Sequence, residues 1–399
     1  MTRSRARHRS RGSRAASPPP PPASAEALAY LHDPDEAIRG NSVQLLIGGD
    51  EAYPRMLEAI ASAQRTAWLE VYEFWDDKVG RLFASALAER AKAGVDVRVL
   101  VDALGAALSA GRLLDELKGS GVKVRAVFEL RPWLRAWRWF RRDHRKLLVV
   151  DGRSAFTGGL NVGMPYAGPR YGGAGWEDLQ LEVHGPAVVA LSRLFARLWR
   201  RNGGEPIDEP PHCPVAGEEV VRVLANHLAR SRKEIRLAYR FAIDLAQKSI
   251  FIANAYFLPG PSMLKALVRA RRRGAQVTII LPGANDIPGF QLASRARYQR
   301  LLAAGVRIFE TRGTMLHSKA AVIDGQWTTV GSCNLDTWSL HRNLELNVAV
   351  LGPRMAGVVQ GHLEALLAKC DEITLEGVRH WPLGLRLMQL ACLLVFIFW

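Results

Sequence analysis

Apolar and polar positions in the first half of the chain predict a strand, a helix and a second strand in succession. Residues 66–74 (TAWLEVYEF) are rich in β-forming residues and alternate in polarity, which is typical of a strand. Residues 81–93 carry apolar side chains at helical spacing, and Gly94 marks a turn. Residues 95–103 (VDVRVLVDA) then form a second strand-like run.

The second half repeats this order. Residues 249–258 (SIFIANAYFL) predict a strand, residues 263–273 a helix that ends at Gly274, and residues 276–283 (QVTIILPG) a second strand. The same sequence of elements at two places in one chain predicts an internal duplication.

Strands that alternate with helices predict an α/β fold in which each half has a mixed, mostly parallel sheet flanked by helices. The glycines and prolines of residues 201–216 break any regular element and separate the halves. Two tandem, pseudo-symmetric domains would bring corresponding loops face to face, with an active site at their interface. The predicted divisions are a tail (1–24), a first domain (25–205), a second domain (206–378) and a terminal segment (379–399).

The two ends of the chain differ from the rest in composition. The first 24 residues contain six arginines and then five prolines, which predicts a disordered basic tail, either a solvated linker or an electrostatic tether to an anionic surface. It has no apolar run of the kind found in a signal peptide. Residues 387–399 are apolar except for Gln389. Their length falls short of the roughly 20 residues that span a bilayer, so an anchor in one leaflet is favoured over a span, with a buried core helix as the alternative.

The net charge indicates an anionic partner. The chain has 399 residues, with 54 Lys and Arg against 38 Asp and Glu, which gives a formal charge of +16. Nucleic acid and anionic lipid both fit this charge. The four cysteines are widely separated, so no zinc site or disulfide framework is indicated, and a reducing compartment is expected.

A group of polar residues recurs in strict register between the halves. Each member of the second set lies 173 positions after its counterpart (144 to 317, 146 to 319, 151 to 324, 161 to 334), which makes coincidence a poor explanation. Glycine-rich turns precede both asparagines, and Ser332 stands in the second turn. The two sets are His144, Lys146, Asp151 and Asn161, and His317, Lys319, Asp324 and Asn334.

This pattern suits the transfer of a phosphodiester. The residues between each lysine and aspartate are apolar and predict a buried strand, on which a histidine and a lysine two positions apart share one face. One neutral histidine can attack phosphorus, the other can protonate the leaving oxygen, and the lysines can stabilise the charge that develops. Histidine suits both roles because its ordinary pKa is about 6.5. No metal or other cofactor is required.

The carboxylates have expected roles of two kinds. Asp151 and Asp324 complete the motifs, but an acid at a strand end is commonly a turn former or ion-pair partner, so a supporting role is expected for them. Asp178 and Glu345 each stand in a strand-like run that could lie beside the motif of the same half. We therefore expect them to orient the histidines.

The duplicated pattern H-x-K-x4-D-x6-G-G/S-x-N resembles the signature of the phospholipase D superfamily, and it is complete in both halves. The passages LEVYEF, IANAYFLPG, RRRGAQVTIILPG and LHSKAAVIDGQWTTVGSCNLD resemble bacterial cardiolipin synthases, in particular the B-type branch that lacks two N-terminal membrane helices. The resemblance covers residues 41 to 380. It implies two phospholipase-D-like domains.

The resemblance implies that a phosphatidyl group passes from phosphatidylglycerol to a histidine, expels glycerol, and then moves to a hydroxyl of a second phospholipid. His144 would be the nucleophile and His317 the acid and then the base, although the near symmetry of the halves allows the reverse. It also implies peripheral or monotopic association with the cytoplasmic face of a bacterial inner membrane. One chain supplies both motifs, so a monomer would suffice, and the oligomeric state stays open.

Aromatic and basic residues alternate just before the first motif, in residues 131–146. Tryptophan favours the headgroup level of a bilayer and arginine binds phosphate, so this stretch predicts a membrane contact through Trp133, Trp137, Arg138 and Trp139. The same composition could hold nucleic acid. A nuclease of this superfamily is therefore a rival, which the duplication in one chain and the apolar C-terminus disfavour. A hydrolytic phospholipase D is a closer rival, and a non-catalytic lipid-binding scaffold is disfavoured because both histidines and both lysines are present.

Overall fold

A computed structural model describes residues 36–128, 141–208, 212–226 and 233–398. The elements of the first half are, in chain order, β1 (Ile38–Ile47), α2 (Gly48–Ser62), β2 (Thr66–Val71), α3 (Lys78–Lys92), β3 (Asp96–Asp102), α4 (Ala103–Ser109), α5 (Leu113–Gly119), β4 (Lys123–Val127), β5 (Leu147–Val150), β6 (Ser154–Gly158), the short 3-10 helix η2 (Pro169–Tyr171), β7 (Leu179–His184) and α6 (Ala187–Arg201).

The second half repeats most of this succession. Its elements are β8 (Glu219–Ala225), α7 (Glu234–Leu245), β9 (Ser249–Asn254), α8 (Pro261–Arg272), β10 (Gln276–Leu281), α9 (Phe290–Arg295), α10 (Tyr298–Leu302), β11 (Arg307–Thr311), β12 (Lys319–Ile323), β13 (Trp327–Gly331), α11 (Thr337–His341), β14 (Leu346–Leu351), α12 (Pro353–Leu367), β15 (Cys370–Ile373), α13 (Leu375–Arg379) and α14 (Leu383–Phe398).

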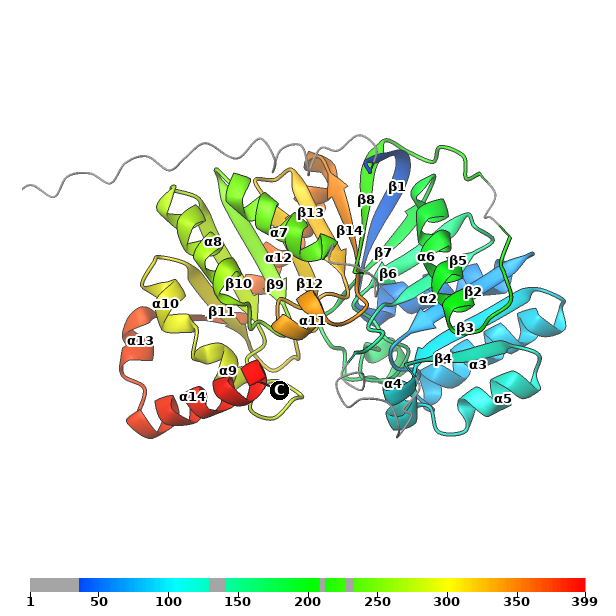
Figure 1. Cartoon of the computed structure of the whole chain (residues 1–399), viewed down its shortest axis with the longest axis horizontal. Helices are drawn as coiled ribbons and strands as arrows, with labels where there is room; N and C mark the ends of the chain where they lie inside the picture. The colour runs from blue at the N-terminus through cyan, green and yellow to red at the C-terminus, as the bar shows by residue number, and fades with distance from the viewer. Residues whose placement is uncertain (1–35, 129–140, 209–211, 227–232, 399) are drawn as a thin grey trace, which may run out of the picture.

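The strands join in one order that is nearly symmetric about its centre. From edge to edge the order is β15-β11-β10-β9-β12-β13-β14-β8-β1-β7-β6-β5-β2-β3-β4. Strands β1 and β8 meet in the middle, and the two halves extend to either side of them (Figure 1). The α/β class and the pseudo-symmetric duplication are confirmed. The division at residues 205 and 206 falls between α6 and β8, and the domain limits themselves stay a prediction.

The sheet is mixed, as expected, but the prediction that it is mostly parallel is wrong. Among the described strands, parallel pairing is confined to β2-β3-β4 and β9-β10-β11. The other pairs are antiparallel, among them β5-β6 and β12-β13, in which a short turn connects the two strands. In each turn an Asp-Gly pair adopts positive φ, with 53° at Asp151 and Asp324, and this backbone conformation reverses the chain within a few residues.

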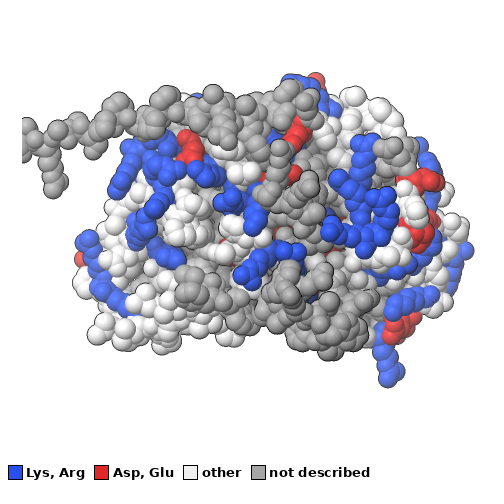
Figure 2. Space-filling view, in the orientation of Figure 1, with Lys and Arg blue, Asp and Glu red and all other residues white. Residues whose placement is uncertain are grey.

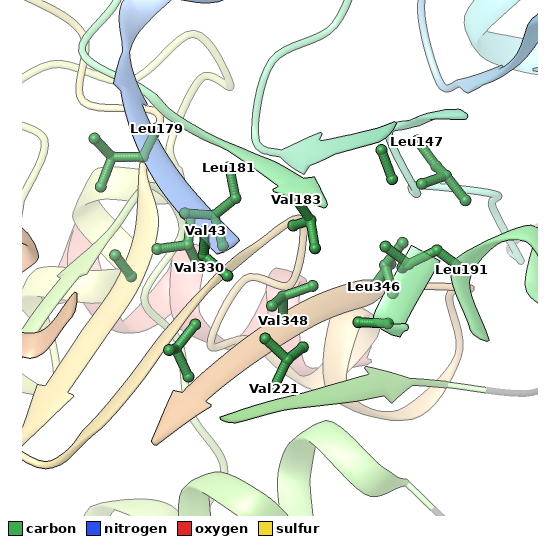
Figure 3. Close-up of a cluster of buried hydrophobic side chains, with 14 of the residues drawn as sticks. Val43, Leu147, Leu179, Leu181, Val183, Leu191, Val221, Val330, Leu346 and Val348 are labelled. Atoms are coloured by element: carbon green, nitrogen blue, oxygen red, sulfur yellow. The ribbon is translucent and has the colours of Figure 1, made fainter. Parts of the chain in front are cut away.

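A shared hydrophobic core holds the two halves together. Val43, Leu181 and Val183 of the first half and Val221 and Val348 of the second belong to one cluster of buried side chains. Figure 3 shows these side chains facing one another between strands of both halves. The burial of so much apolar surface fixes the halves relative to each other, and therefore also the loops that carry the motifs.

Candidate active site

Each histidine motif is hydrogen-bonded to the opposite half of the molecule. The backbone N–H of His144 donates to the carbonyl of Leu344 (2.9 Å), and the N–H of His317 donates to the carbonyl of Glu177 (2.8 Å). Isolated β-bridges join Asp143 to Leu344 and Glu177 to Leu316. The two crossings are reciprocal, so the main chain itself brings the motifs together.

The histidines line one cavity of about 680 Å³ at the junction of the halves. Asn161 and Asn334 also line it, and the cavity lies within the usual size range of ligand sites. The predicted convergence of residues 173 positions apart is therefore present in the structure. The described side chains in the wall that the sequence did not single out include Tyr72, Glu73, Arg142, Tyr166, Tyr256 and Asp286.

The imidazole of His144 is oriented by Glu345. Nδ1 of His144 lies 3.1 Å from Oε2 of Glu345, which is fully buried. The hydroxyl of Ser332 donates to the same oxygen at 2.5 Å. A carboxylate at Nδ1 favours the tautomer with hydrogen on that nitrogen, and this tautomer leaves a lone pair on Nε2.

Asp178 has the matching position beside His317. Its Oδ2 lies 2.6 Å from Nδ1 of the imidazole, and its other carboxylate oxygen accepts the backbone N–H of Leu179 at 2.8 Å. Asp178 and Glu345 each stand immediately before a strand, β7 and β14, at equivalent points of the two halves. The carboxylates expected to orient the histidines therefore do contact them, but each contacts the histidine of the other half.

The lysines are buried beneath the histidines. Lys146 is 2% exposed and Lys319 is fully buried. Nζ of Lys146 donates to the carbonyl of His144 (2.8 Å), and Nζ of Lys319 donates to the carbonyl of His317. Burial lowers the pKa of Lys146 to about 7 and that of Lys319 to about 8, because a charged ammonium loses its hydration there. The protonation of both lysines therefore changes near neutral pH.

Burial also lowers the pKa of both histidines. The effect on His317 is the larger, and the neighbouring Lys319, whose Nζ lies 2.8 Å from Nδ1, lowers its pKa further. Burial likewise lowers the pKa of His144, against the opposing effect of Glu345. Both imidazoles are thus neutral near pH 7 in the free protein, which is the state that a nitrogen nucleophile requires. Desolvation raises the pKa of Asp178 to about 6.

The two asparagines differ in their hydrogen bonding. Nδ2 of Asn161 donates to the hydroxyl of Tyr166 (2.6 Å) and to Glu73 (3.3 Å), and its Oδ1 accepts the backbone N–H of Glu73 (3.2 Å). Asn334 is 4% exposed, and its Oδ1 has no hydrogen-bond partner among the described residues. The hydrogen-bonding groups of Asn161 are thus all used within the protein, whereas Oδ1 of Asn334, in the cavity wall, is an acceptor without a partner among the described residues.

Asp151 and Asp324, for which a supporting role is expected, bind backbone N–H groups away from the histidines. Asp151 accepts the backbone N–H groups of residues 64, 65 and 66 at 2.8–2.9 Å, and Asp324 accepts those of residues 247, 248 and 249 at 2.7–2.8 Å. Both lie at the ends of β5 and β12 opposite the histidines, and neither lines the cavity. Their spacing is the same in the two motifs because each forms a turn that joins the motif strand to its neighbouring strand.

Aromatic rings around the histidines were missed by the sequence reasoning. The ring of Tyr72 lies 5.3 Å from that of His144, and the rings of Tyr166 and Trp176 lie 5.2 and 5.5 Å from that of His317. Tyr72 belongs to LEVYEF, which aligns with IANAYF of the second half, but its counterpart there is Ala255, so the repeat did not mark it. Tyr166 and Trp176 stand in an irregular segment that has no counterpart of equal length, so no pattern marked them.

The structure describes only one of the two segments that are predicted to contact a membrane. Trp133, Trp137, Arg138 and Trp139 lie outside the described residues. The apolar terminal segment forms α14, which packs against α9 at the lower left of Figure 1. Within the described part of the chain, none of the helices combines the length and the apolar character needed to cross a bilayer.

Comparison with known proteins identifies relatives over most of the chain. The family described as cardiolipin synthase, PLD-like domain, matches residues 56–199 and 239–367. Cardiolipin synthase B of Shigella flexneri and that of Escherichia coli (strain K12) are each 34% identical over 357 residues, which cover 86% of this chain and 85% of theirs. Cardiolipin synthase A of Pseudomonas syringae is 32% identical over 89% of this chain and 75% of its own length.

Solved structures show the same fold at low sequence identity. The phosphatidylserine synthase of Haemophilus influenzae superposes with a TM-score of 0.71 at 14% identity, over 93% of this chain and 99% of its own. The polyphosphate kinase of Porphyromonas gingivalis gives 0.59 at 15% identity, over 84% of this chain and 49% of its own. The family match and the extended identity together show that the chain belongs to the cardiolipin synthase family of phospholipase-D-like proteins.

Proposed function

We propose that this protein joins two phosphatidylglycerol molecules to give cardiolipin and glycerol. The observation that carries the proposal is the cavity that contains both histidines, each held by a carboxylate of the opposite half. The curated relatives are named cardiolipin synthases, which supports this phospholipid substrate class.

In the first step, Nε2 of His144 attacks the phosphorus of phosphatidylglycerol. A phosphorus–nitrogen bond forms and the bond from phosphorus to the glycerol oxygen breaks. His317, which takes up a proton when the anionic phosphodiester enters the cavity and raises its pKa, gives that proton to the glycerol oxygen. His144 is the preferred nucleophile because its side chain is 14% exposed against 4% for His317, so a bulky phosphodiester reaches it more easily. Nearby Lys146 and Lys319 stabilise negative charge on the phosphoryl oxygens.

In the second step, His317 acts as a base toward a hydroxyl of the second phosphatidylglycerol. That oxygen attacks phosphorus, the phosphorus–nitrogen bond breaks, and His144 is regenerated. Glu73 and Asp286 line the cavity, and carboxylates accept hydrogen bonds from hydroxyl groups, which is compatible with a polyol acceptor. His317 alternates between acid and base, as an imidazole can near neutral pH.

We also propose peripheral association with the cytoplasmic face of a bacterial inner membrane. Four unpaired cysteines support a reducing compartment, and a phospholipid substrate requires a lipid surface. A single chain supplies both motifs to the cavity, so a monomer is sufficient for the chemistry.

The direct test is an incubation of the purified protein with phosphatidylglycerol vesicles in the presence of a metal chelator. Cardiolipin and released glycerol in equal amounts are expected, and a phosphatidyl group should be trapped on His144 after rapid acid-free quenching. Phosphatidic acid as the main product would show that the protein hydrolyses phosphatidylglycerol and does not transfer the phosphatidyl group to a second lipid. Turnover by His144→Ala or His317→Ala close to that of the wild type would contradict the two-histidine mechanism.

A further inference from the structure

Helix α14 has the reverse of the usual polarity of a surface helix. Its one charged residue is Arg386, and its polar Gln389 is buried at 4% exposure. The large side chains on its outer face are all apolar and between 52% and 72% exposed: Leu383, Leu387, Met388, Leu390, Leu394 and Val395. A soluble protein rarely leaves a continuous apolar helix face in water, so this face indicates a partner.

The other side of α14 is part of the wall of the catalytic cavity. Leu393 packs into a cluster with Tyr256 and Phe290, and the rings of Phe290 and Phe396 lie 5.1 Å apart. Tyr256, Phe290 and Phe396 all line the cavity that holds the histidines. The apolar face is therefore continuous with the opening of the active site.

Apolar side chains lie on both sides of that opening. In the second half, Ile287 lines the cavity and is 40% exposed. In the first half, Leu104 of α4 lines the cavity, and Leu108, one helical turn further, is 70% exposed. Figure 1 shows α4 and α14 at the same lower edge of the molecule, and in Figure 2 the lower left edge is white, without charged atoms.

We infer that the outer face of α14, together with Leu108 and Ile287, is a docking face that lies in the surface of a phospholipid bilayer and presents the cavity mouth to the lipid. The inference rests on the proposed function, since a lipid with two acyl chains must leave the bilayer at the cavity. Helix α14 has 16 residues, fewer than the roughly 20 that span a bilayer, and its apolar arc covers one side only. A helix that lies in the bilayer surface has these properties, and docking at that surface lets the acyl chains enter the cavity without passing through water.

Two measurements test the docking face. The first is hydrogen exchange of the wild-type chain with and without vesicles of phosphatidylcholine and phosphatidylglycerol. Protection is expected in residues 383–398 and in residues 103–109 together, because both border the mouth. Protection by vesicles that is confined to other parts of the molecule would overturn the inference. Protection of α14 alone that is already present without lipid would also overturn it, because it would show that this face pairs with a second chain.

The second measurement uses the triple variant Leu387→Glu, Leu390→Glu and Leu394→Glu. All three side chains are exposed, so the fold should persist, and partition onto the same vesicles should fall at least about tenfold. The control is Val358→Glu on α12, where the side chain is 50% exposed and outside the docking face. Unchanged partition of the triple variant, or an equal loss in the control, would overturn the inference.

Activity on a soluble substrate separates the docking face from the chemistry. With a short-chain phosphatidylglycerol below its micelle concentration, the triple variant should retain turnover within about twofold of the wild type, because no residue of the cavity wall is changed. An equal loss on soluble and vesicle substrates would overturn the docking role. If the wild type itself forms no cardiolipin from either substrate, the proposed function fails, while vesicle partition still reports on the docking face.

Discussion

Nδ1 of His144 lies 3.1 Å from a carboxylate oxygen of Glu345, which stands 201 positions later in the chain. The matching pair, His317 and Asp178, spans 139 positions in the opposite direction. Each half thus supplies one imidazole and the carboxylate that orients the imidazole of the other half.

Glu345→Gln and Asp178→Asn should each lower kcat by about two to four orders of magnitude, with little change in KM. The amide keeps the shape of the side chain but no longer fixes the hydrogen on Nδ1, as in a hydrolase triad that loses its carboxylate. Steady-state kinetics on phosphatidylglycerol measures the loss, and far-ultraviolet circular dichroism checks the fold. A loss below about fivefold in either variant would remove the orienting role.

Asp151→Ala should reduce stability by about 1–3 kcal/mol while leaving the turnover of the folded protein close to that of the wild type. The carboxylate accepts three backbone N–H groups, which lose their partner in the variant. Denaturant unfolding gives the stability, and Asp324→Ala offers the equivalent change in the second half. A fall in kcat of tenfold or more at unchanged stability would restore a catalytic part for these residues.

The pH profile of kcat/KM should be bell-shaped. Activity rises with pH as the histidine nucleophile loses its proton, and this limb lies below the ordinary value of 6.5 because burial lowers the pKa of His144. It falls again as His317, the acid of the first step, ceases to take up its proton, and as Lys146, with a pKa of about 7, and Lys319, at about 8, lose the charge that attracts the phosphodiester. In kcat the alkaline limb should move upward, because a bound anion raises the pKa of both lysines.

The profile has a matched control. In Lys146→Arg the guanidinium stays charged throughout the accessible range, so the part of the alkaline limb that Lys146 causes should disappear even if the maximum rate is lower. An alkaline limb that is identical in the wild type and this variant would show that Lys146 does not cause it.

The turn before each asparagine is not equivalent in the two halves. Ser332→Ala removes the 2.5 Å hydrogen bond to Glu345 and should lower kcat by roughly tenfold, the effect of one charge-assisted hydrogen bond. Gly159→Ser, which copies Ser332 into the first half, should do more harm, since an added Cβ would lie 2.1 Å from Oδ1 of Asp178. Kinetics and thermal unfolding of the two variants measure this asymmetry. Equal tolerance of both changes would contradict it.

The repeat made much of the site predictable. Residues in register at 173 positions had to be equivalent, and the duplicated strand and helix order placed them at one interface. Asp178 and Glu345 could be singled out because each begins a strand-like run. The expectation that each would lie beside the histidine of its own half is wrong. A crossed and an uncrossed arrangement give the same pattern along the chain, so the sequence could not distinguish them.

Other features had no local signal. Two of the antiparallel pairs, β5-β6 and β12-β13, depend on the turns at Asp151 and Asp324, where an aspartate at positive φ reads in the sequence only as a turn former. The aromatic wall beside His317 comes from Tyr166 and Trp176, whose positions are set by tertiary packing of a non-repeated segment. A segment without periodicity gives no basis for placing its side chains.

The reciprocal backbone contacts beside His144 and His317 mean that neither histidine is positioned without the other half of the chain. A small rotation of one half against the other would withdraw both carboxylates at the same moment, so the enzyme has no geometry in which a single imidazole is competent. A chain cut into its two repeats would yield fragments that each carry a complete motif and yet no working histidine. Each half therefore depends on the other for the carboxylate that fixes the hydrogen on its own imidazole.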